Sequence, residues 1–402
     1  MNEPELDPPA ALEKLTARIE PLRELESVRL DAALGRVLGA DVIATLDVPP
    51  FDNAAMDGYA LRAADHAATL RVVGRALAGH PFDGLLGPGQ AVRIMTGAAL
   101  PSGADAVALQ EDVRGDSERI TVDSSVAPGL NVRPRGEQFD RGTAVLKRGR
   151  KLRSYDLGLA AAAGARALTV VRRVRVGVLS TGDELLDPPA PPASSEQYDG
   201  NRPMLCASLA HDGFEIVDLG IVGDRDEALN ASLAAAGRHG LDAVLSTGGV
   251  AQGDADIVRR QGMLEFIPLA LRPGRGIAFG RMELDGHAFW YVGMPGNAVA
   301  AYVVYHLVTA PLLAHLAGAR EERPLFVEVP LSRATRTRAG RVDWRRGRFI
   351  VRDGRVAVEL LAQQGSSMLR TLSEADALVG IGPEPTTAAG QPVPVIPLAA
   401  LP

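Results

Sequence analysis

Three apolar segments of the chain each run directly into a short loop that contains glycine and polar groups. VGVLS precedes Thr181-Gly182-Asp183-Glu184, AVLS precedes Thr247-Gly248-Gly249, and WYVGM precedes Pro295-Gly296-Asn297. Glycine lets a ligand approach the backbone closely, and a helix that begins after such a loop offers unpaired N–H groups to an anion. One exposed helix end contributes only roughly 0.3–1 kcal/mol to anion binding, so several must converge. Each loop alone could be a simple tight turn, but the three together favour a shared anion site.

Acidic residues in the same candidate loops indicate a second feature of this site. These residues are Asp183, Glu184, Asp199, Asp224, Asp254 and Asp256. Bare carboxylates repel phosphate, so they make sense if a divalent cation with oxygen ligands, typically Mg²⁺, lies between them and a polyanion. Some could instead cap helices. We favour capping for Asp224 and Asp254, and a functional role for Glu184 and Asp256.

Positive charge follows another strand-like segment, FIPLAL, in the turn Arg272-Pro273-Gly274-Arg275. Two guanidinium groups that flank a turn suit a tetrahedral oxyanion, because arginine offers several donors in a fixed geometry. A solvated surface turn is the common alternative, and position alone does not decide between them. A serine elbow, an HExxH motif, a P-loop and a GxGxxG fingerprint are all absent from the sequence.

The elements that must position these loops alternate between strand-like and helix-like segments from Arg175 to about Arg320. VRVGVLS, LDAVLS and FWYVGM are predicted strands, whereas ALNASLAAAGRHG, GDADIVRRQGML and the apolar run after Asn297 are predicted helices. This alternation predicts parallel strands with crossover helices, a doubly wound α/β layer. In such a layer the loops at the carboxyl ends of the strands lie at one edge, where open α/β folds bind ligands.

The remaining stretches differ in their spacing of apolar residues and glycines, and this difference predicts further domains. Residues up to about Val48 have apolar spacing typical of helices, in ALEKLTARIEPL and VRLDAALGRVLGADV. Short β-like runs cut by glycine follow, and a helix is predicted at 154–165 that could pair with the N-terminal helices. From Leu325 the chain is again β-rich, with an Asp353-Gly354 hairpin turn. We therefore predict an N-terminal domain (1–48 plus 146–173), an inserted glycine-rich β domain (49–145), the α/β domain (174–323) and a C-terminal β domain (324–402).

Composition limits the class of protein. The chain has 402 residues and a formal net charge of -6, which argues against a general nucleic-acid binder. Cys206 is the only cysteine, so a disulfide framework is excluded and a cytoplasmic location is expected. The acidic, proline-bearing N-terminal sequence is not expected to be a secretory signal. The apolar run from Ala298 to Ala319 is predicted to be a buried helix rather than a membrane span.

The segment FDNAAMDGYA at 51–60 closely resembles the signature of the MoeA/gephyrin E-domain family, the molybdopterin molybdenumtransferases. Further family motifs follow in order over nearly the whole chain. They are AVRIMTGAALPSGADAV (91–107), NVRPRGE (131–137), VGVLSTGDEL (176–185), YDGN (198–201), Gly248-Gly249, Pro295-Gly296-Asn297 and QGSSML (364–369).

This resemblance implies a four-domain homodimer whose α/β domain is similar to the molybdopterin adenylyltransferases, and whose C-terminal β domain is barrel-like. It implies an enzyme that takes adenylylated molybdopterin and molybdate, with Mg²⁺, and yields molybdenum cofactor and AMP. The site is expected between the α/β domain of one subunit and the glycine-rich β domain of the other. Molybdopterin adenylyltransferase and molybdoenzymes are the protein partners that such a role suggests, and neither nucleic acid nor membrane is expected as a partner.

Matching motifs carry the family's functional residues to this sequence. Activity is expected to depend on Asp57, Thr96, Glu184 and Asp256, and Glu184 and Asp256 are the expected metal ligands. The pterin phosphate or the nucleotide is expected to contact Thr181, Gly182, Asp183, Asp199, Asn201, Gly248, Gly249, Gly253, Pro295, Gly296 and Asn297. Molybdate is expected to contact Arg272 and Arg275, which stand at lysine positions of the family, together with Arg346 and Ser366 of the last domain.

The sequence departs from the family's pattern at four motifs near this site. Gln138 replaces an aspartate, Ala251 replaces a serine, and Gly276 and Ala298 each replace a proline. Arginine in place of lysine keeps the charge but changes the donor geometry, and losing prolines loosens two loops. Two alternatives to the enzyme therefore stay open. One is a paralogue with altered metal preference, such as tungstate, or one that only binds or delivers molybdopterin. The other is a scaffold dimer, for which the sequence offers no readable binding feature.

Overall fold

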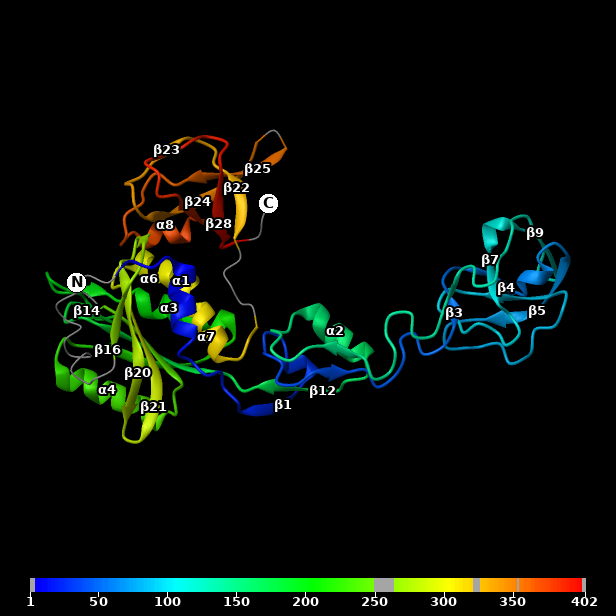
Figure 1. Cartoon of the computed structure of the whole chain (residues 1–402), viewed down its shortest axis with the longest axis horizontal. Helices are drawn as coiled ribbons and strands as arrows, with labels where there is room; N and C mark the ends of the chain where they lie inside the picture. The colour runs from blue at the N-terminus through cyan, green and yellow to red at the C-terminus, as the bar shows by residue number, and fades with distance from the viewer. Residues whose placement is uncertain (1–3, 249–263, 321–325, 353, 400–402) are drawn as a thin grey trace. The chain divides into compact units, whose positions relative to one another are not determined.

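The computed structural model describes residues 4–248, 264–320, 326–352 and 354–399 (Figure 1). The chain divides into two compact units, one made of 1–26, 35–37 and 171–402 and the other of 27–34 and 38–170. The predicted functional residues Gly249, Gly253 and Asp256 lie outside the described residues, as do Ala251, Asp254 and nearly all of the helix predicted from Gly253.

A six-stranded sheet forms the centre of the larger unit. Its strand order is β16 (Glu215–Val222), β13 (Arg175–Thr181), β17 (Ala243–Thr247), β21 (His287–Met294), β20 (Gly276–Leu284) and β18 (Glu265–Pro268). The first four strands are parallel, as predicted, but β20 and β18 run antiparallel to their neighbours, so the sheet is mixed. The reason is the hairpin between β20 and β21, where Asp285 and Gly286 both have positive φ, at 52° and 75°. An Asp-Gly pair is a preferred sequence for such a two-residue hairpin turn.

Alternating side chains of the central strands enter two apolar clusters, one on each face of the sheet. On β13, Val176 and Val178 belong to one cluster and Leu179 to the other. The first cluster is covered by helices α1 (Pro8–Thr16), α3 (Asn201–Asp212), α6 (Ala298–Val304) and α7 (Ala310–Leu316), and the second by α4 (Asp226–Arg238) (Figure 1). Burial of both faces explains why these strands are apolar throughout.

The N-terminal helix α1 packs in this larger unit, which corrects the predicted N-terminal domain of 1–48 plus 146–173. Ala11, Leu15 and Ile19 lie in the first apolar cluster of the sheet. The backbone N–H of Leu6 donates to Pro268, and that of Ala270 donates to Leu6. The spacing of the apolar residues predicted a helix correctly, but it could not tell which domain the apolar stripe would join.

The helix predicted after Asn297 continues through a π-helical turn at Tyr305–Thr309 and ends at Leu316. In the described part of the chain, Ala298–Leu316 is the one helix whose length and hydropathy would allow a membrane span. Because 78% of its most apolar window is buried inside the protein, it has the character of a core helix, as the sequence predicted.

The C-terminal segment of the larger unit forms the predicted barrel-like β domain. Its strands are β19 (Leu271–Arg272), β22 (Val327–Pro330), β23 (Thr335–Arg336), β24 (Val342–Arg352), β25 (Arg355–Leu360), β26 (Ala377–Ile381), β27 (Thr386–Thr387) and β28 (Pro392–Pro397), with one helix, α8 (Leu369–Ser373). The order β25-β24-β26-β28-β22 is closed by a bridge between Leu331 and Val358. The predicted hairpin joins β24 to β25, although Asp353 itself lies outside the described residues.

The smaller unit contains the predicted glycine-rich β domain. Its sheet has the order β7 (Ala106–Leu109), β4 (Gly58–Leu61), β6 (Gln90–Ile94), β5 (Thr69–Ala76), β9 (Arg119–Val122) and β8 (Val113–Gly115). A short pair, β3 (Asn53–Ala54) and β10 (Val132–Arg133), lies beside it.

A second cluster of the smaller unit joins residues from before and after the β domain. It contains the predicted helix α2 (Ser154–Ala162) and the pairs β2 (Val42–Ile43) with β11 (Ala144–Leu146) and β1 (Leu25–Arg29) with β12 (Ala167–Val171). The helix predicted over 28–42 is wrong. Gly35 adopts a φ of 73°, which ends any helix there, and Leu38 donates its N–H to Arg150, far along the chain.

Candidate functional site

Three loops meet at the carboxyl edge of the central sheet, at Thr181, Gly248 and Gly296. Gly248 has a φ of 89°, and a Cβ there would lie only 2.5 Å from the carbonyl oxygen of Thr181. A Cβ on Gly296 would lie 3.3 Å from the Cα of Gly248. Glycine is therefore required at this junction for close approach of the backbones as well as for the left-handed conformation. The structure brings together these described members of the three loops that the sequence singled out.

Asn201 ties a fourth segment to this junction. It begins helix α3, and its Nδ2 donates to the carbonyl oxygen of Gly296 at 2.6 Å. Asn297, which is exposed, is the N-cap of the helix that runs to Leu316, and its side chain makes no capping hydrogen bond. The N–H of Val299 donates to the carbonyl oxygen of Ser366 at 3.0 Å, so the QGSS loop reaches the start of this helix.

The acidic residues of this edge differ in whether a neighbouring loop donates to their carboxylates. Asp183 accepts a hydrogen bond from the N–H of Asp224 at 3.0 Å, and Asp224 accepts one from the N–H of Asp183 at 3.4 Å. Asp224 therefore joins two loops, which corrects its prediction as a helix cap, because the N-cap of α4 is Arg225. Glu184 is exposed, and its carboxylate lies over Gly182.

Asp199 does not face a ligand, which corrects its predicted binding role. Its side chain is buried, with a relative exposure of 1%. One carboxylate oxygen accepts from the N–H groups of Asn201 and Arg202, at 2.9 and 3.2 Å. The other accepts from Nε of Arg202 at 3.2 Å. Asp199 thus fixes the start of α3 and acts on the junction only through Asn201.

The predicted arginine turn lies beside the helix that starts at Asn297. A Cβ on Gly274 would lie 2.9 Å from Cγ2 of Val304, so the turn packs directly on that helix. Arg272 donates through Nη2 to the carbonyl oxygens of residues 338 and 339, and Arg275 is exposed. Glu5 pairs with Arg341 close by, and Arg341, Arg275 and Arg272 together lower the pKa of Glu5 against the opposing effect of burial. Arg341 has the largest effect on this carboxylate, and the two arginines of the turn add to it.

Arg346 is buried within the C-terminal domain, with a relative exposure of 1%. Its guanidinium donates to the carbonyl oxygens of Gln363 and Gly365 and to Oγ1 of Thr371, at 3.4, 3.0 and 3.0 Å. These contacts correct the prediction that Arg346 contacts an oxyanion. It holds the loop that carries Ser366 instead, which the sequence could not reveal because the partners are 17 to 25 positions away.

In the smaller unit, Asp57 and Thr96 lie in direct contact. Oδ1 of Asp57 accepts from the N–H of Thr96 at 2.8 Å and from its hydroxyl at 2.7 Å. These two hydrogen bonds, with a smaller effect of Arg93, lower the pKa of Asp57 below its usual range. The next residue must be glycine, because a Cβ on Gly58 would lie 1.9 Å from the carbonyl oxygen of Ala108. The signature motif thus presents a partly exposed aspartate whose carboxylate stays ionised at neutral pH.

Among the described residues, no group of three or more histidine, cysteine, aspartate or glutamate side chains forms a ready-made metal cage. The exposed carboxylate of Glu184 is a hard oxygen donor at the junction's edge. A sparse acidic set of this kind fits Mg²⁺, which usually keeps several waters and is bound by one or two carboxylates together with substrate phosphates.

Comparison with known proteins agrees with the architecture. Family models match residues 6–164 as the MoeA N-terminal region (domains I and II), 177–315 as a probable molybdopterin-binding domain, and 328–398 as the MoeA C-terminal region (domain IV). A molybdopterin molybdenumtransferase of Haemophilus influenzae is 34% identical over 384 residues, which are 93% of this chain and 94% of the relative. Another from Synechococcus elongatus is 34% identical over 404 residues, covering 96% and 98% of the two chains.

A solved structure supports the same assignment. The crystal structure of a molybdopterin biosynthesis MoeA protein from Pyrococcus horikoshii OT3 matches with a TM-score of 0.82 and 27% identity, over 98% of this chain and 99% of that one. All three family models match in order, and the relatives match over nearly the full length, so both comparisons assign the chain to the same family. This chain belongs to the MoeA family.

Proposed function

We propose that this protein is a molybdopterin molybdenumtransferase, which inserts molybdenum from molybdate into adenylylated molybdopterin and releases AMP. The observation that carries the proposal is the junction of Thr181, Gly248 and Gly296 in the molybdopterin-binding domain, where three loops meet at one edge of the sheet and Gly296 is exposed. The relatives that span nearly the whole chain carry this enzyme name, which supports the same activity over a role limited to binding or delivery.

The described residues would divide the work of binding a polyanion. The exposed backbone at Gly296, with the start of the helix at Asn297, would bind phosphate oxygens of the pterin nucleotide. Arg275, exposed beside that helix, would hold molybdate together with Arg272. Release of AMP needs positioning and charge neutralisation more than a strong protein nucleophile, so a catalytic triad is unnecessary.

Asp57 would act as an ionised group in this scheme. Because the two hydrogen bonds from Thr96 lower its pKa, it is a hydrogen-bond acceptor at neutral pH and not a proton donor. Replacing Asp57 with alanine is expected to abolish turnover and leave the fold intact, since the side chain is not part of any of the three apolar clusters of its unit.

Mg²⁺ is the proposed metal, with Glu184 and Asp256 as its carboxylate ligands. When bound, Mg²⁺ would supply positive charge to the phosphate groups of the substrate. Glu184 is exposed, and its carboxylate lies beside Gly182, in the loop whose first residue, Thr181, contacts Gly248. Asp256 enters this proposal only through its motif.

Release of AMP tests the function directly. Purified protein would be incubated with adenylylated molybdopterin and Mg²⁺, with molybdate, with tungstate, or with no oxyanion. We expect AMP release that molybdate stimulates, and the tungstate arm reports whether the arginines at 272 and 275 change the oxyanion preference. Binding of the pterin nucleotide without oxyanion-stimulated AMP release would instead indicate a binding or delivery protein.

We also propose a homodimer with sites shared between subunits, as the family resemblance suggests. Subunit mixing offers a sharp test, because Asp57→Ala and Glu184→Ala should each be inactive alone. If each site takes Asp57 from one subunit and Glu184 from the other, a mixed dimer contains one intact site and regains activity. No recovery in a mixture that has demonstrably exchanged subunits would contradict the shared site.

A further inference from the structure

Arg202, in the first turn of α3, gathers three carboxylates from three separate segments. Its Nε donates to Asp199 at 3.2 Å, and its two terminal nitrogens pair with Asp187 and Asp218. The residue is 8% exposed, so its guanidinium is shielded from water and depends on these partners. Burial alone would lower the pKa of Arg202, but Asp218, Asp187 and Asp199 together raise it, so the group stays cationic.

Two of these carboxylates, Asp187 and Asp199, lie in the loop that leaves the sheet after Thr181. Asp187 follows the short strand β14 (Leu185–Leu186), and Asp199 follows β15 (Gln197–Tyr198), which pairs with β14 in parallel. The same loop begins with Gly182, Asp183 and Glu184. Arg202 therefore holds the far end of the loop whose near end carries the predicted metal and phosphate ligands.

The third carboxylate belongs to a β-bulge in β16. Val178 pairs with Asp218 but Leu179 pairs with Gly220, which leaves Leu219 as the extra residue. Asp218 accepts the N–H of Gly220 at 2.9 Å, and Gly220 has a φ of 79°. A bulge re-aims the strand that follows it, and bulges are frequent next to active sites. Here the re-aimed segment leads to the loop of Asp224, which bonds to Asp183.

We propose that Arg202 is a positioning residue of the pterin nucleotide site, because it sets the hydrogen bond between Asn201 and Gly296. The path is direct: Arg202 orients Asp199, Asp199 accepts the N–H of Asn201 at 2.9 Å, and Asn201 donates to Gly296 at 2.6 Å. Its effect on turnover rests on the proposed function, whereas its effect on loop order does not.

The exposure of two of the three aspartates argues against a role in stability alone. The side chains of Asp187 and Asp218 are 57% and 52% exposed, so water would solvate them well without Arg202. The ion pairs that they form with Arg202 are therefore not needed to compensate a buried charge on either aspartate. What they do provide is geometry, since each fixes the position of a different segment relative to α3. Only Asp199 depends on Arg202 for compensation of a buried charge.

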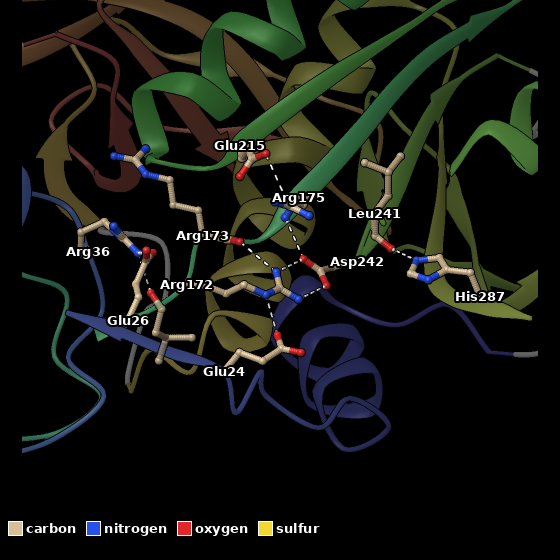
Figure 2. Close-up of polar contacts among 11 residues, drawn as sticks. Glu24, Glu26, Arg36, Arg172, Arg173, Arg175, Glu215, Leu241, Asp242 and His287 are labelled. Carbon is tan, nitrogen blue, oxygen red and sulfur yellow. Dashed lines mark hydrogen bonds and ion pairs between the residues drawn. The ribbon is translucent and has the colours of Figure 1, made fainter. Parts of the chain in front are cut away.

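Replacement of Arg202 is tested against a matched arginine at the opposite end of the sheet. Arg172 also pairs with two carboxylates in the same unit, those of Asp242 and Glu24, but contacts none of the loops at the carboxyl edge (Figure 2). We expect Arg202→Met to speed hydrogen–deuterium exchange at the amides of 182–187, 199–202 and 295–299 on the order of tenfold, and Arg172→Met to leave these amides unchanged. Unchanged exchange in Arg202→Met would overturn the proposal even if the protein proved to have no transferase activity.

Kinetics provide the second measurement. Arg202→Met should raise KM for adenylylated molybdopterin on the order of tenfold with a smaller change in kcat, and Arg202→Lys should recover part of the loss because it keeps the charge. Combined with Asn201→Ala, the two effects should be clearly less than additive, because both residues act through Gly296. An additive pair, or an equal rise in KM for Arg172→Met, would contradict the proposal. If Arg202→Met does not fold, Asp218→Ala keeps the buried pair intact and should show smaller changes of the same kind.

Discussion

At the amino ends of the central strands, charged side chains pair with one another, whereas at the carboxyl ends glycine lets the backbones of three loops approach closely. Arg172 donates to both oxygens of Asp242 at 2.7 and 2.8 Å and also pairs with Glu24. Asp242 further accepts the N–H of Arg175, whose guanidinium lies 3.2 Å from Glu215 (Figure 2). At the other ends of the same strands lie Thr181, Gly248 and Gly296, where the closest approaches are between backbones.

The two ends of the sheet differ in whether their polar groups bond only to one another or leave some groups exposed for a ligand. At the amino ends, carboxylates and guanidiniums satisfy each other, and nothing in the network calls for a ligand. At the carboxyl ends the charged groups Asp183, Asp199, Asp224 and Arg202 bond within or between loops, and they leave Glu184 and the start of the helix at Asn297 exposed. Charge alone would not have distinguished the two ends. What distinguishes them is whether side chains fill the edge or only position its loops.

The largest effect is expected from adding one methyl group at the carboxyl end of β17. In Gly248→Ala the new Cβ would meet the carbonyl oxygen of Thr181 at 2.5 Å, so the loops must separate, and we expect turnover to fall about a hundredfold or more. The control is Gly240→Ala, just before the same strand, where φ is also positive but the nearest atom, in Arg175, lies at 3.5 Å. That variant should lose about 1–2 kcal/mol of stability from backbone strain and keep its activity. Equal AMP release by the two variants would remove the functional contrast between the ends.

A second prediction concerns the amino end. Arg172→Met leaves Asp242 with a side chain only 11% exposed and no cationic partner, so the free energy of unfolding should fall by about 2 kcal/mol in urea titrations. The figure is below that for a fully buried pair because Arg172 is itself 26% exposed. KM and kcat measured well below the unfolding transition should not change. A loss of activity without a loss of stability would show that this end also serves the site.

The third prediction separates exposed acids at the two ends by their response to metal. Glu184→Gln should raise the Mg²⁺ concentration needed for half-maximal AMP release on the order of tenfold, because an amide is a weaker ligand for Mg²⁺ than a carboxylate. Glu215→Gln, which removes an exposed carboxylate beside Arg175, is the control and should leave that concentration unchanged. Titration of Mg²⁺ at saturating molybdate measures both. Equal shifts would indicate a general effect of charge rather than a ligand.

Local pattern was enough to predict the strands and loops of this edge. β13, β17 and β21 were predicted because their apolar runs are continuous, and the glycines after them stand where the structure brings Thr181, Gly248 and Gly296 together. The antiparallel position of β20 was missed, although Asp285-Gly286 is a hairpin sequence. The false helix over 28–42 had helix-like apolar spacing, but its partners lie more than 100 positions away, as in the bond from Leu38 to Arg150.

Burial in the structure shows which of the predicted site residues hold loops instead of contacting ligand, and the sequence could not show this. Asp199 and Arg346 were predicted to contact ligand because they stand in matching motifs, yet each is buried and bonds to the backbone of a nearby loop. Arg202 carried no signal beyond its place after Asn201. A side chain that faces a ligand and one that holds the loop beneath it can occupy neighbouring positions, and only tertiary contacts separate them.

The smallest effect is expected at Cys206, on the inner side of α3. Burial raises the pKa of this thiol to about 11, and Asp218 adds to the shift. At pH 8 the thiol is therefore neutral, and its alkylation by iodoacetamide should be roughly two orders of magnitude slower than that of a free thiol, so brief treatment should leave turnover unchanged. The alkylation rate should keep rising about tenfold per pH unit from pH 8 to 10, whereas a free thiol levels off near pH 9. The urea-unfolded chain, with the same single cysteine, is the control. A plateau near pH 9 in the folded protein would mean that α3 is loosely packed. Solvent would then reach the inner side of α3 as well as the loops of the carboxyl edge.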